Sequence, residues 1–264
     1  MKLGFIGCGN MASAIMGGIL KNGLMQATDI IGADVSAACR EKARENLGIH
    51  IAENNREVVE KADLFVLSVK PQFYAEVIAE IKDIVRDDQV VITLAPGKTL
   101  VWLEEQFEKP VKLIRTMPNT PAMVQEGMTG VCYNENVTAE ELEYALCMLR
   151  SFGEAEVIPE KLMDAVVAVS GSSPAYVYMM IEAMADAAVA EGMPRAQAYK
   201  FAAKAVMGSA KMVLETGKHP GELKDMVCSP AGTTIEAVKV LEAAGFRSAI
   251  MEAMEVCAEK SRGM

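Results

Sequence analysis

The sequence predicts an α/β domain with a parallel sheet covered by helices, followed by an all-helical domain. Over residues 1–160, short apolar runs alternate with helical patterns, which is typical of a parallel sheet covered by helices. After residue 160 the strand patterns stop and only helical periodicity continues. The first apolar run ends at a glycine-rich turn that opens a helical pattern. We therefore expect two domains, residues 1–160 and 161–264.

The predicted strands are short apolar runs bounded by turn residues. Three of them, at 64–69, 90–94 and 111–114, are almost continuously apolar, as expected for strands buried on both faces. Weaker patterns at 131–133 and 156–158 are expected to close the sheet. In chain order we expect strands at 3–6, 29–33, 49–52, 64–69, 90–94, 111–114, 131–133 and 156–158.

The predicted helices show apolar residues at spacings of three and four. The first extends from Asn10 to Lys21, and Gly23 is its expected C-terminal stop. Pro174 and Pro194 stand where the first turn of a helix accepts proline. In chain order we expect helices at 10–21, 37–47, 56–61, 73–85, 99–107, 162–169, 175–191, 196–216 and 234–262, the last with a break near Gly245.

Composition argues against several classes of function. Lys and Arg number 26 against 36 Asp and Glu, a formal charge of −10 that opposes binding to nucleic acid or to an anionic membrane. No uncharged apolar run reaches the about 18 residues of a membrane span, and the first apolar run is too short for a signal peptide. The six cysteines form no C-x-x-C pair and there are two histidines, so we expect no metal site. The chain is too long and too apolar to need a disulfide framework, so a reducing cytoplasm fits best.

Gly7, Gly9 and Ala12 form a G-x-G-x-x-A pattern between the first predicted strand and the first predicted helix. The first glycine permits a tight turn, the second lets a pyrophosphate approach the backbone, and the alanine allows close packing of helix and strand. Unpaired N–H groups and the helix dipole favour phosphate there. The alternative is a strand–helix turn with no ligand, but in this context the pattern predicts a dinucleotide cofactor.

Asp34 ends the second predicted strand, 25 residues after Gly9, where an acidic side chain can accept hydrogen bonds from a ribose. Its carboxylate would repel a 2′-phosphate, and no arginine is adjacent in sequence to compensate. Ser36 could contact either form of the cofactor. We expect NADH to be at least competitive with NADPH; the alternative for Asp34 is a turn or cap role.

Further loops are expected beside the cofactor, because ligands of open parallel sheets bind beyond the carboxyl ends of the strands. Segment 68–71 follows the fourth predicted strand and segment 95–97 follows the fifth. Lys70 offers a positive charge, with a solvated loop lysine as the alternative. Prolines stiffen segment 117–121, which forms either a wall of the site or a simple turn.

Two features mark the second predicted domain. Ser229, Gly232, Thr233 and Thr234 precede a predicted helix, where exposed amides and hydroxyls suit a carboxylate, although ordinary N-capping would look the same. Segment 183–210 contains 11 alanines, which predicts either the core of a helical hairpin or a helix layer shared between two subunits.

At these motifs the chain resembles the pyrroline-5-carboxylate reductases, which catalyse the last step of proline synthesis. The resemblance implies an N-terminal Rossmann domain and an all-helical dimerisation domain similar to the C-terminal domain of 6-phosphogluconate dehydrogenase. It implies a homodimer with interleaved helical domains, often assembled into a larger ring such as a decamer, and no nucleic-acid or membrane partner. The implied reaction is hydride transfer from NADP(H) or NAD(H) to 1-pyrroline-5-carboxylate, giving L-proline. The resemblance is carried by residues 4–12, 69–72, 117–121, 170–176 and, most specifically, 223–241 and 245–247.

The resemblance also implies site residues, with the cofactor domain of one subunit facing the helices of its partner. The Thr234 hydroxyl is the expected hydrogen-bond partner of the ring nitrogen. The chain departs from the family pattern at Ser173, which replaces a usual glycine, at Met226, which replaces a frequent asparagine, and at Asp34. The residues implied for the substrate are Glu160, Ser229, Gly232, Thr233 and Thr234. Those implied for the cofactor are Ile6, Gly7, Cys8, Gly9, Asn10, Met11, Ala12, Asp34, Ser36, Asn55, Ser68, Val69, Lys70, Pro71, Ala95, Pro96 and Gly97.

Three alternative functions stay open on the sequence. One is a reductase of a related cyclic imine, and another is a hydroxyacid dehydrogenase of the same architecture. Such dehydrogenases typically use a lysine acid–base on the helical domain, and no equivalent lysine motif stands out here. The third is a non-catalytic nucleotide-binding sensor, against which the intact segment 229–234 argues.

Overall fold

The computed structural model describes residues 2–263, which divide into two compact units. The first unit contains residues 2–172 together with 257–263, and the second contains residues 173–256. Segment 160–172 belongs to the first unit, where Met163 is buried in the core of the sheet domain. The change of periodicity at residue 160 therefore comes before the division between the compact units, because a helical segment packs on the sheet first.

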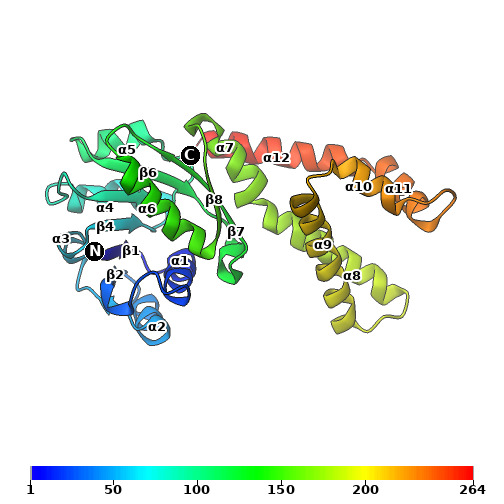
Figure 1. Ribbon diagram of the computed structural model, residues 1–264, viewed down its shortest axis with the longest axis horizontal. Coiled ribbons are helices and arrows are strands. Elements are labelled where there is room, and N and C mark those ends of the chain that lie inside the picture. The colour runs from blue at the N-terminus through cyan, green and yellow to red at the C-terminus, as the bar shows by residue number, and fades with distance from the viewer. Residues whose placement is uncertain (1, 264) are drawn as a thin grey trace. The chain divides into compact units, whose positions relative to one another are not determined.

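An eight-stranded sheet forms the centre of the first unit, in the order β3-β2-β1-β4-β5-β6-β7-β8 (Figure 1). Neighbouring strands are parallel except for β6 and β7, which are antiparallel. The order reverses between β1 and β4, and ligands of doubly wound sheets bind beyond such a switch point. The strands are β1 (Leu3–Ile6), β2 (Ile30–Ala33), β3 (His50–Ile51), β4 (Leu64–Leu67), β5 (Val90–Thr93), β6 (Lys112–Met117), β7 (Gly127–Tyr133) and β8 (Gly153–Val157).

Helices cover both faces of this sheet because successive side chains of a strand point to opposite faces. Leu3 and Phe5 of β1 belong to the core shared with α1 (Asn10–Lys21), α2 (Ala37–Leu47) and α6 (Ala139–Leu149). Ile6 belongs to the opposite core, shared with α3 (Asn55–Lys61), α4 (Tyr74–Ile81) and α5 (Leu100–Phe107). The predicted parallel sheet covered by helices is thus confirmed, and so is the Rossmann arrangement that the resemblance implies.

Several helices of the first unit begin at a side-chain cap. Ser36, Asn54, Thr99 and Thr138 each accept a hydrogen bond from the backbone N–H three residues later, which satisfies one of the unpaired amides of the first turn. The first helix differs, since α1 begins at Gly9 with no side-chain cap. Its first-turn amides are therefore not occupied by a capping side chain.

Two helices lie outside the predicted set. The first is α6, although the Thr138–Glu141 capping box and the buried Leu146 and Leu149 carry a helical signal. The second is α10 (Pro220–Val227), which follows His219, whose Nδ1 accepts a hydrogen bond from the Gly221 N–H at 3.0 Å. The helix predicted at 73–85 is shorter, since α4 ends at Ile81 and a 3₁₀ turn (Pro71–Phe73) precedes it.

The second unit contains helices only: α8 (Ser173–Ala190), α9 (Arg195–Thr216), α10, α11 (Thr233–Ala243) and most of α12 (Phe246–Arg262). The end of α12 belongs to the first unit, where the Ser261 hydroxyl donates to Asp164 Oδ1 at 2.6 Å. Within residues 2–263, no helix is long and apolar enough to cross a membrane.

Candidate active site

The turn after β1 depends on glycine at position 7. Gly7 has a φ of +98°, and its N–H donates to the carbonyl of Ala33 at 2.7 Å. A Cβ at this position would lie 2.8 Å from the carbonyl oxygen of Ser68, which is backbone and cannot move aside freely. Both the conformation and the space therefore exclude a side chain here.

Gly9 serves a different purpose, because a Cβ there would meet no atom within 4 Å. It is the N-cap of α1 and has an ordinary extended conformation, so nothing within the chain requires glycine at this position. The open space lies over the uncapped amides of α1, while Ala12 is buried beneath them. This arrangement fits a phosphate group, which needs close approach to backbone N–H donors at a helix start.

Asp34 lies at the end of β2 and contacts the same turn. Its Oδ2 accepts a hydrogen bond from the Cys8 N–H at 2.7 Å, and its Oδ1 accepts one from the Ser36 N–H at 2.8 Å. The Arg40 guanidinium donates from Nη1 to the carbonyl of Asp34 at 2.6 Å. An arginine thus reaches this loop from the first turns of α2, although none is adjacent to Asp34 in the sequence.

Side-chain hydrogen bonds hold the ends of the neighbouring strands. Ser68 Oγ, just past β4, lies 2.6 Å from the carbonyl oxygen of Gly7, so the end of β4 is joined to the glycine turn. The Tyr74 hydroxyl donates to the carbonyl of Leu67 at 2.5 Å and accepts from the Leu94 N–H at 3.1 Å. Burial raises the pKa of Tyr74, so it remains a neutral donor. The loops 68–71 and 95–97 therefore leave the sheet at fixed positions.

Sequence reasoning missed Tyr74, which lies within a helix predicted from its apolar pattern. The available signal was one hydroxyl-bearing side chain in the apolar face of that helix. Of the other predicted cofactor residues on this side, Lys70 is exposed and the Asn55 amide donates to Glu80 Oε2 at 2.7 Å. Their contact with a cofactor stays a prediction.

Glu160, predicted to lie near the substrate, has two partners inside the first unit. Its Oε1 accepts from the Leu100 N–H at 2.8 Å and from Arg115 Nη1 at 2.7 Å. The Arg115 side chain is only 5% exposed, so this ion pair supplies the partner that a buried guanidinium needs. Glu160 thereby fixes the start of α5 next to the loop 95–97, and its contact with substrate stays a prediction.

Segment 117–121 supports a second segment that carries the family resemblance. Asn119 Oδ1 accepts from the Met128 N–H at 2.9 Å, and its Nδ2 donates to the carbonyl of Ser170 at 3.2 Å. Ser170 belongs to a π-helical turn (Val167–Gly171), and such turns are frequent at functional sites. A Cβ on Gly171 would lie 2.7 Å from Met117 Cε. The Asn119 side chain therefore joins this segment to the π-helical turn, and the role of the segment as a wall of the site stays a prediction.

The predicted substrate residues of the second unit gather at the start of α11. The Gly232 N–H donates to the carbonyl of Ser229 at 3.0 Å, and a Cβ on Gly232 would lie 2.3 Å from Ser229 Oγ. Gly232 is the N-cap, and no side chain caps the helix. Side-chain capping, the alternative reading of this motif, is thus absent in the described structure, and the first-turn amides suit a carboxylate.

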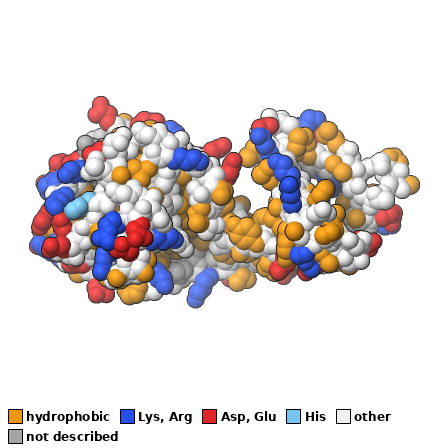
Figure 2. All heavy atoms as spheres, turned by 90° about the horizontal axis from the view of Figure 1, so that it is seen from below, with side chains coloured by type: hydrophobic (Ala, Val, Ile, Leu, Met, Phe, Trp, Pro, Cys, Tyr) orange, Lys and Arg blue, Asp and Glu red, His pale blue; other side chains and the backbone are white. Residues whose placement is uncertain are grey.

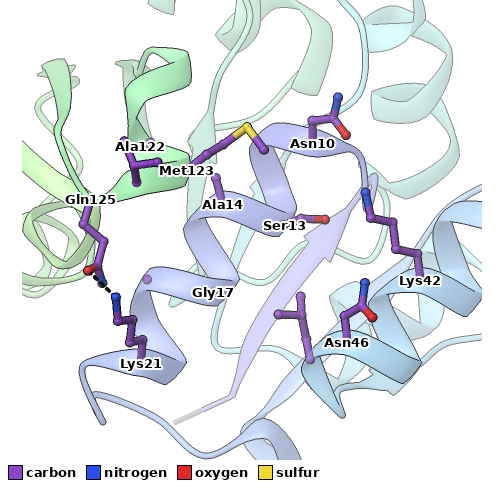
Figure 3. A pocket seen from close by; sticks show the side chains of 13 residues that line it. Asn10, Ser13, Ala14, Gly17, Lys21, Lys42, Asn46, Ala122, Met123 and Gln125 are labelled. Carbon is purple, nitrogen blue, oxygen red and sulfur yellow. Dashed lines mark hydrogen bonds between the residues drawn. The ribbon is translucent and has the colours of Figure 1, made fainter. Parts of the chain in front are cut away.

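A groove of about 380 Å³ runs along α1 in the first unit (Figure 3). Its walls come from α2 and from a 3₁₀ segment (Thr120–Val124), and Lys21 at one end donates to Gln125 Oε1 at 2.8 Å. Asn10 is the only predicted cofactor residue that lines it. The groove follows the side of α1, where backbone amides are already paired within the helix, so we place the phosphates at the turn instead.

The structure therefore brings the predicted residues together in two groups. Those predicted for the cofactor surround the carboxyl ends of β1, β2, β4 and β5, with Asn55 at the start of α3. Those predicted for the substrate lie at the start of α11 in the second unit, except for Glu160, which lies in the first.

Comparison with known proteins identifies the family. A family model described as pyrroline-5-carboxylate reductase dimerisation matches residues 160–264, and one described as NADP oxidoreductase, coenzyme F420-dependent, matches residues 2–97. The pyrroline-5-carboxylate reductase of Escherichia coli strain K12 is 55% identical over 260 residues, which cover 98% of this chain and 97% of that protein. The chain belongs to the pyrroline-5-carboxylate reductase family.

Other reductases of this family agree in sequence and in fold. The pyrroline-5-carboxylate reductase of Methanosarcina acetivorans is 43% identical over 99% of this chain and 97% of its own length. A crystal structure of the Plasmodium falciparum pyrroline carboxylate reductase with NADP bound matches with a TM-score of 0.92 and 32% identity, covering 100% of this chain and 97% of that one. The resemblance and the fold class predicted from the sequence are both confirmed.

The two glycines of the turn should respond differently to the same substitution. Gly9→Ala should lower the affinity for a nicotinamide dinucleotide at least about tenfold, because its methyl group enters the space needed by the phosphates. Its stability should be unchanged or higher by about 0.4–1 kcal/mol, since the native conformation suits alanine. In Gly7→Ala the free energy of unfolding should instead fall by more than about 1 kcal/mol, because the positive φ and the nearby Ser68 carbonyl exclude a side chain. Calorimetric titration measures the dinucleotide affinity of each variant, and thermal unfolding measures its stability. Unchanged affinity in Gly9→Ala would contradict the placement of the phosphates at this turn.

Removing the Tyr74 hydroxyl should weaken both the fold and the cofactor site. In Tyr74→Phe the free energy of unfolding should fall by about 1–3 kcal/mol, because the half-buried Leu94 N–H loses its acceptor. The dissociation constant for the dinucleotide should rise as well. Tyr144→Phe is the matched control, since that hydroxyl only lies 3.9 Å from Met25 Sδ. Equal denaturant midpoints for the two variants would show that the Tyr74 contact is unimportant.

Proposed function

We propose that this chain reduces 1-pyrroline-5-carboxylate to L-proline with NADH or NADPH as the reductant. The observation that carries the proposal is the near full-length match to pyrroline-5-carboxylate reductases. Both glycine-capped helix starts fall inside the regions that the two family models match. These two helix starts support an anion site in each unit, which a reaction between a dinucleotide and an amino-acid precursor would require.

The first unit would hold the dinucleotide. The first-turn amides of α1 that follow Gly9 would receive the pyrophosphate, and Asp34 and Ser36 would contact the ribose. The loops 68–71 and 95–97, fixed through Ser68 and Tyr74, would line the nicotinamide half. When bound, a reduced nicotinamide supplies the hydride.

The second unit would bind the ring acid. The first-turn amides of α11 would hold its carboxylate, and the Thr234 hydroxyl would hydrogen-bond the ring nitrogen. Reduction of the C=N bond adds one hydride to carbon and leaves one proton on nitrogen. A protonated imine already carries that proton, so the site needs hydrogen-bonding groups more than a strong acid. The histidines of the described chain fit this requirement, since His50 lies in β3 and His219 caps α10.

The second unit also supports the proposal of a dimer in which each active site uses residues of both subunits. Its buried hydrophobic residues, within the described part of the chain, are the small side chains of Ala185, Ala198 and Ala202. Large apolar side chains remain exposed, among them Phe201 at 66% and Leu214 at 78%, and Figure 2 shows many hydrophobic side chains on the surface of this unit. Burying such a surface is the main driving force for association. A larger ring such as a decamer, a cytoplasmic location and the absence of nucleic-acid and membrane partners complete the proposal.

The test of the function is oxidation of NADH or NADPH in the presence of 1-pyrroline-5-carboxylate. The same assay with piperideine carboxylate, a ring larger by one carbon, distinguishes this substrate from a related cyclic imine. We expect faster turnover of the five-membered ring. Turnover of a hydroxyacid instead, or dinucleotide binding with no turnover of either imine, would contradict the proposal.

Thr234 provides a direct test of the substrate site. Thr234→Ala should lower kcat/KM about 10²-fold, the lower range for a positioned group that handles a proton. Thr234→Ser keeps the hydroxyl and should retain most of the activity, while dinucleotide affinity should be unchanged in both variants. Unchanged steady-state kinetics in Thr234→Ala would remove this hydroxyl from the mechanism.

The exposed apolar helices predict that the active protein is at least a dimer. Light scattering coupled to size-exclusion chromatography should give a mass of two chains or a multiple of two. Dilution that dissociates the assembly should abolish activity, since each site would lose half of its residues. A stable monomer with full activity would contradict the shared site.

A further inference from the structure

We propose that Asp34 makes this enzyme select NADH over NADPH by holding a fixed negative charge where the 2′ position of the adenine ribose is received. The inference rests on the proposed function and names which of the two dinucleotides the cofactor site prefers. Four properties of the loop carry it: the position of the carboxylate, its fixation, its uncompensated charge and its unused acceptor sites.

The position of Asp34 follows from the topology. It directly follows β2, which lies next to β1 in the sheet, and its carboxylate contacts the amide of Cys8 inside the glycine turn. In nucleotide-binding sheets of this type, the residue at the end of the second strand meets the ribose of the adenosine half. The observed contact between Asp34 and the turn is the geometry in which a single dinucleotide could touch both.

The carboxylate is fixed by two backbone donors. The Cys8 N–H at 2.7 Å holds Oδ2, and the Ser36 N–H at 2.8 Å holds Oδ1. Rotating the side chain away from an approaching phosphate would leave both amides without their partner, a cost comparable to losing two hydrogen bonds. The Asp34 side chain therefore cannot rotate away from a 2′-phosphate as easily as an unbonded surface carboxylate could.

The charge of this carboxylate is not compensated by the neighbouring cation. Both of its hydrogen-bond donors are neutral amides, and Arg40 Nη1 contacts the backbone carbonyls of Asp34 and Val35, at 2.6 and 3.2 Å. The pKa of the nearby Cys8 thiol agrees with this. Burial raises that pKa to about 12, and the negative charge of Asp34 raises it by more than the positive charge of Arg40 lowers it. Lys42 projects about 200° further round α2 than Arg40 and lines the groove beside α1 (Figure 3).

A 2′-hydroxyl and a 2′-phosphate would meet this carboxylate in opposite ways. A carboxylate has about four acceptor sites, and the two amides occupy two of them, so a ribose hydroxyl can donate to one that remains. A 2′-phosphate has no proton to donate at neutral pH and brings further negative charge against a fixed anion. Asp34 thus combines an attractive contact with NADH and a repulsive one with NADPH, and specificity arises from the difference.

The test measures dissociation constants of NADH and NADPH by calorimetric titration of the purified, unmodified enzyme and of two variants. The native enzyme should bind NADH at least about tenfold more tightly than NADPH, a difference of about 1.4 kcal/mol. Asp34→Ser removes the charge and should lower this ratio at least about tenfold, mainly by tightening NADPH. Asp34→Asn, which keeps the shape of the side chain, should change the ratio in the same direction. Asp29→Asn, at the opposite end of β2, removes one equal charge away from the turn and should leave the ratio unchanged.

Three binding results would overturn the proposed preference for NADH. Equal or tighter binding of NADPH by the native enzyme would overturn the inference without any variant, and so would a ratio that neither Asp34 variant changes. Either result would leave the proposed reductase activity standing. Failure of both dinucleotides to bind would instead overturn the proposed function and the preference with it.

Discussion

The proposed chemistry depends on the first-turn backbone amides of α1 and α11, which no side chain caps. Both α1 and α11 start at a glycine N-cap, whereas α2, α3, α5 and α6 start at a Ser, Asn or Thr that caps the first turn. An unpaired amide at a helix start costs little while water reaches it and becomes a strong donor once an anion displaces the water. These two helix starts are the anion sites that we propose, one per unit, one for phosphate and one for carboxylate.

The rest of the first unit keeps its anion site in shape through long-range polar contacts. Ser68 joins the end of β4 to the glycine turn, and Tyr74 joins the ends of β4 and β5. Asp34 joins the end of β2 to the same turn, and Glu160 ties the start of α5 to the buried Arg115. The parallel strands alone would bring these loops to one edge of the sheet. The hydrogen bonds of these side chains then fix the positions of the loops relative to one another. The second unit buries only the small side chains of Ala185, Ala198 and Ala202 among its hydrophobic residues, and in the proposed dimer the partner chain would cover its exposed apolar surface.

The sequence predicts most of the fold because its strongest signals are local. Continuous apolar runs mark β4 and β5, and the periodic pattern of α1 gives both of its ends correctly. The helix α6 is missing from the prediction although its capping box is visible in the sequence. The contacts of Tyr74, Asn119 and Glu160 are beyond such reasoning, because their partners lie 7 to 60 residues away and share no motif with them. For the same reason Arg40 is found beside Asp34 only in three dimensions.

The central claim is that two glycine-capped helix starts receive the two anionic reactants. The most direct measurement is a crystal structure of the enzyme with a nicotinamide dinucleotide and L-proline bound together. We predict that the pyrophosphate lies on the amides that follow Gly9 and that the proline carboxylate lies on the amides that follow Gly232. A proline carboxylate bound away from residues 229–234, with the start of α11 still in water, would contradict it.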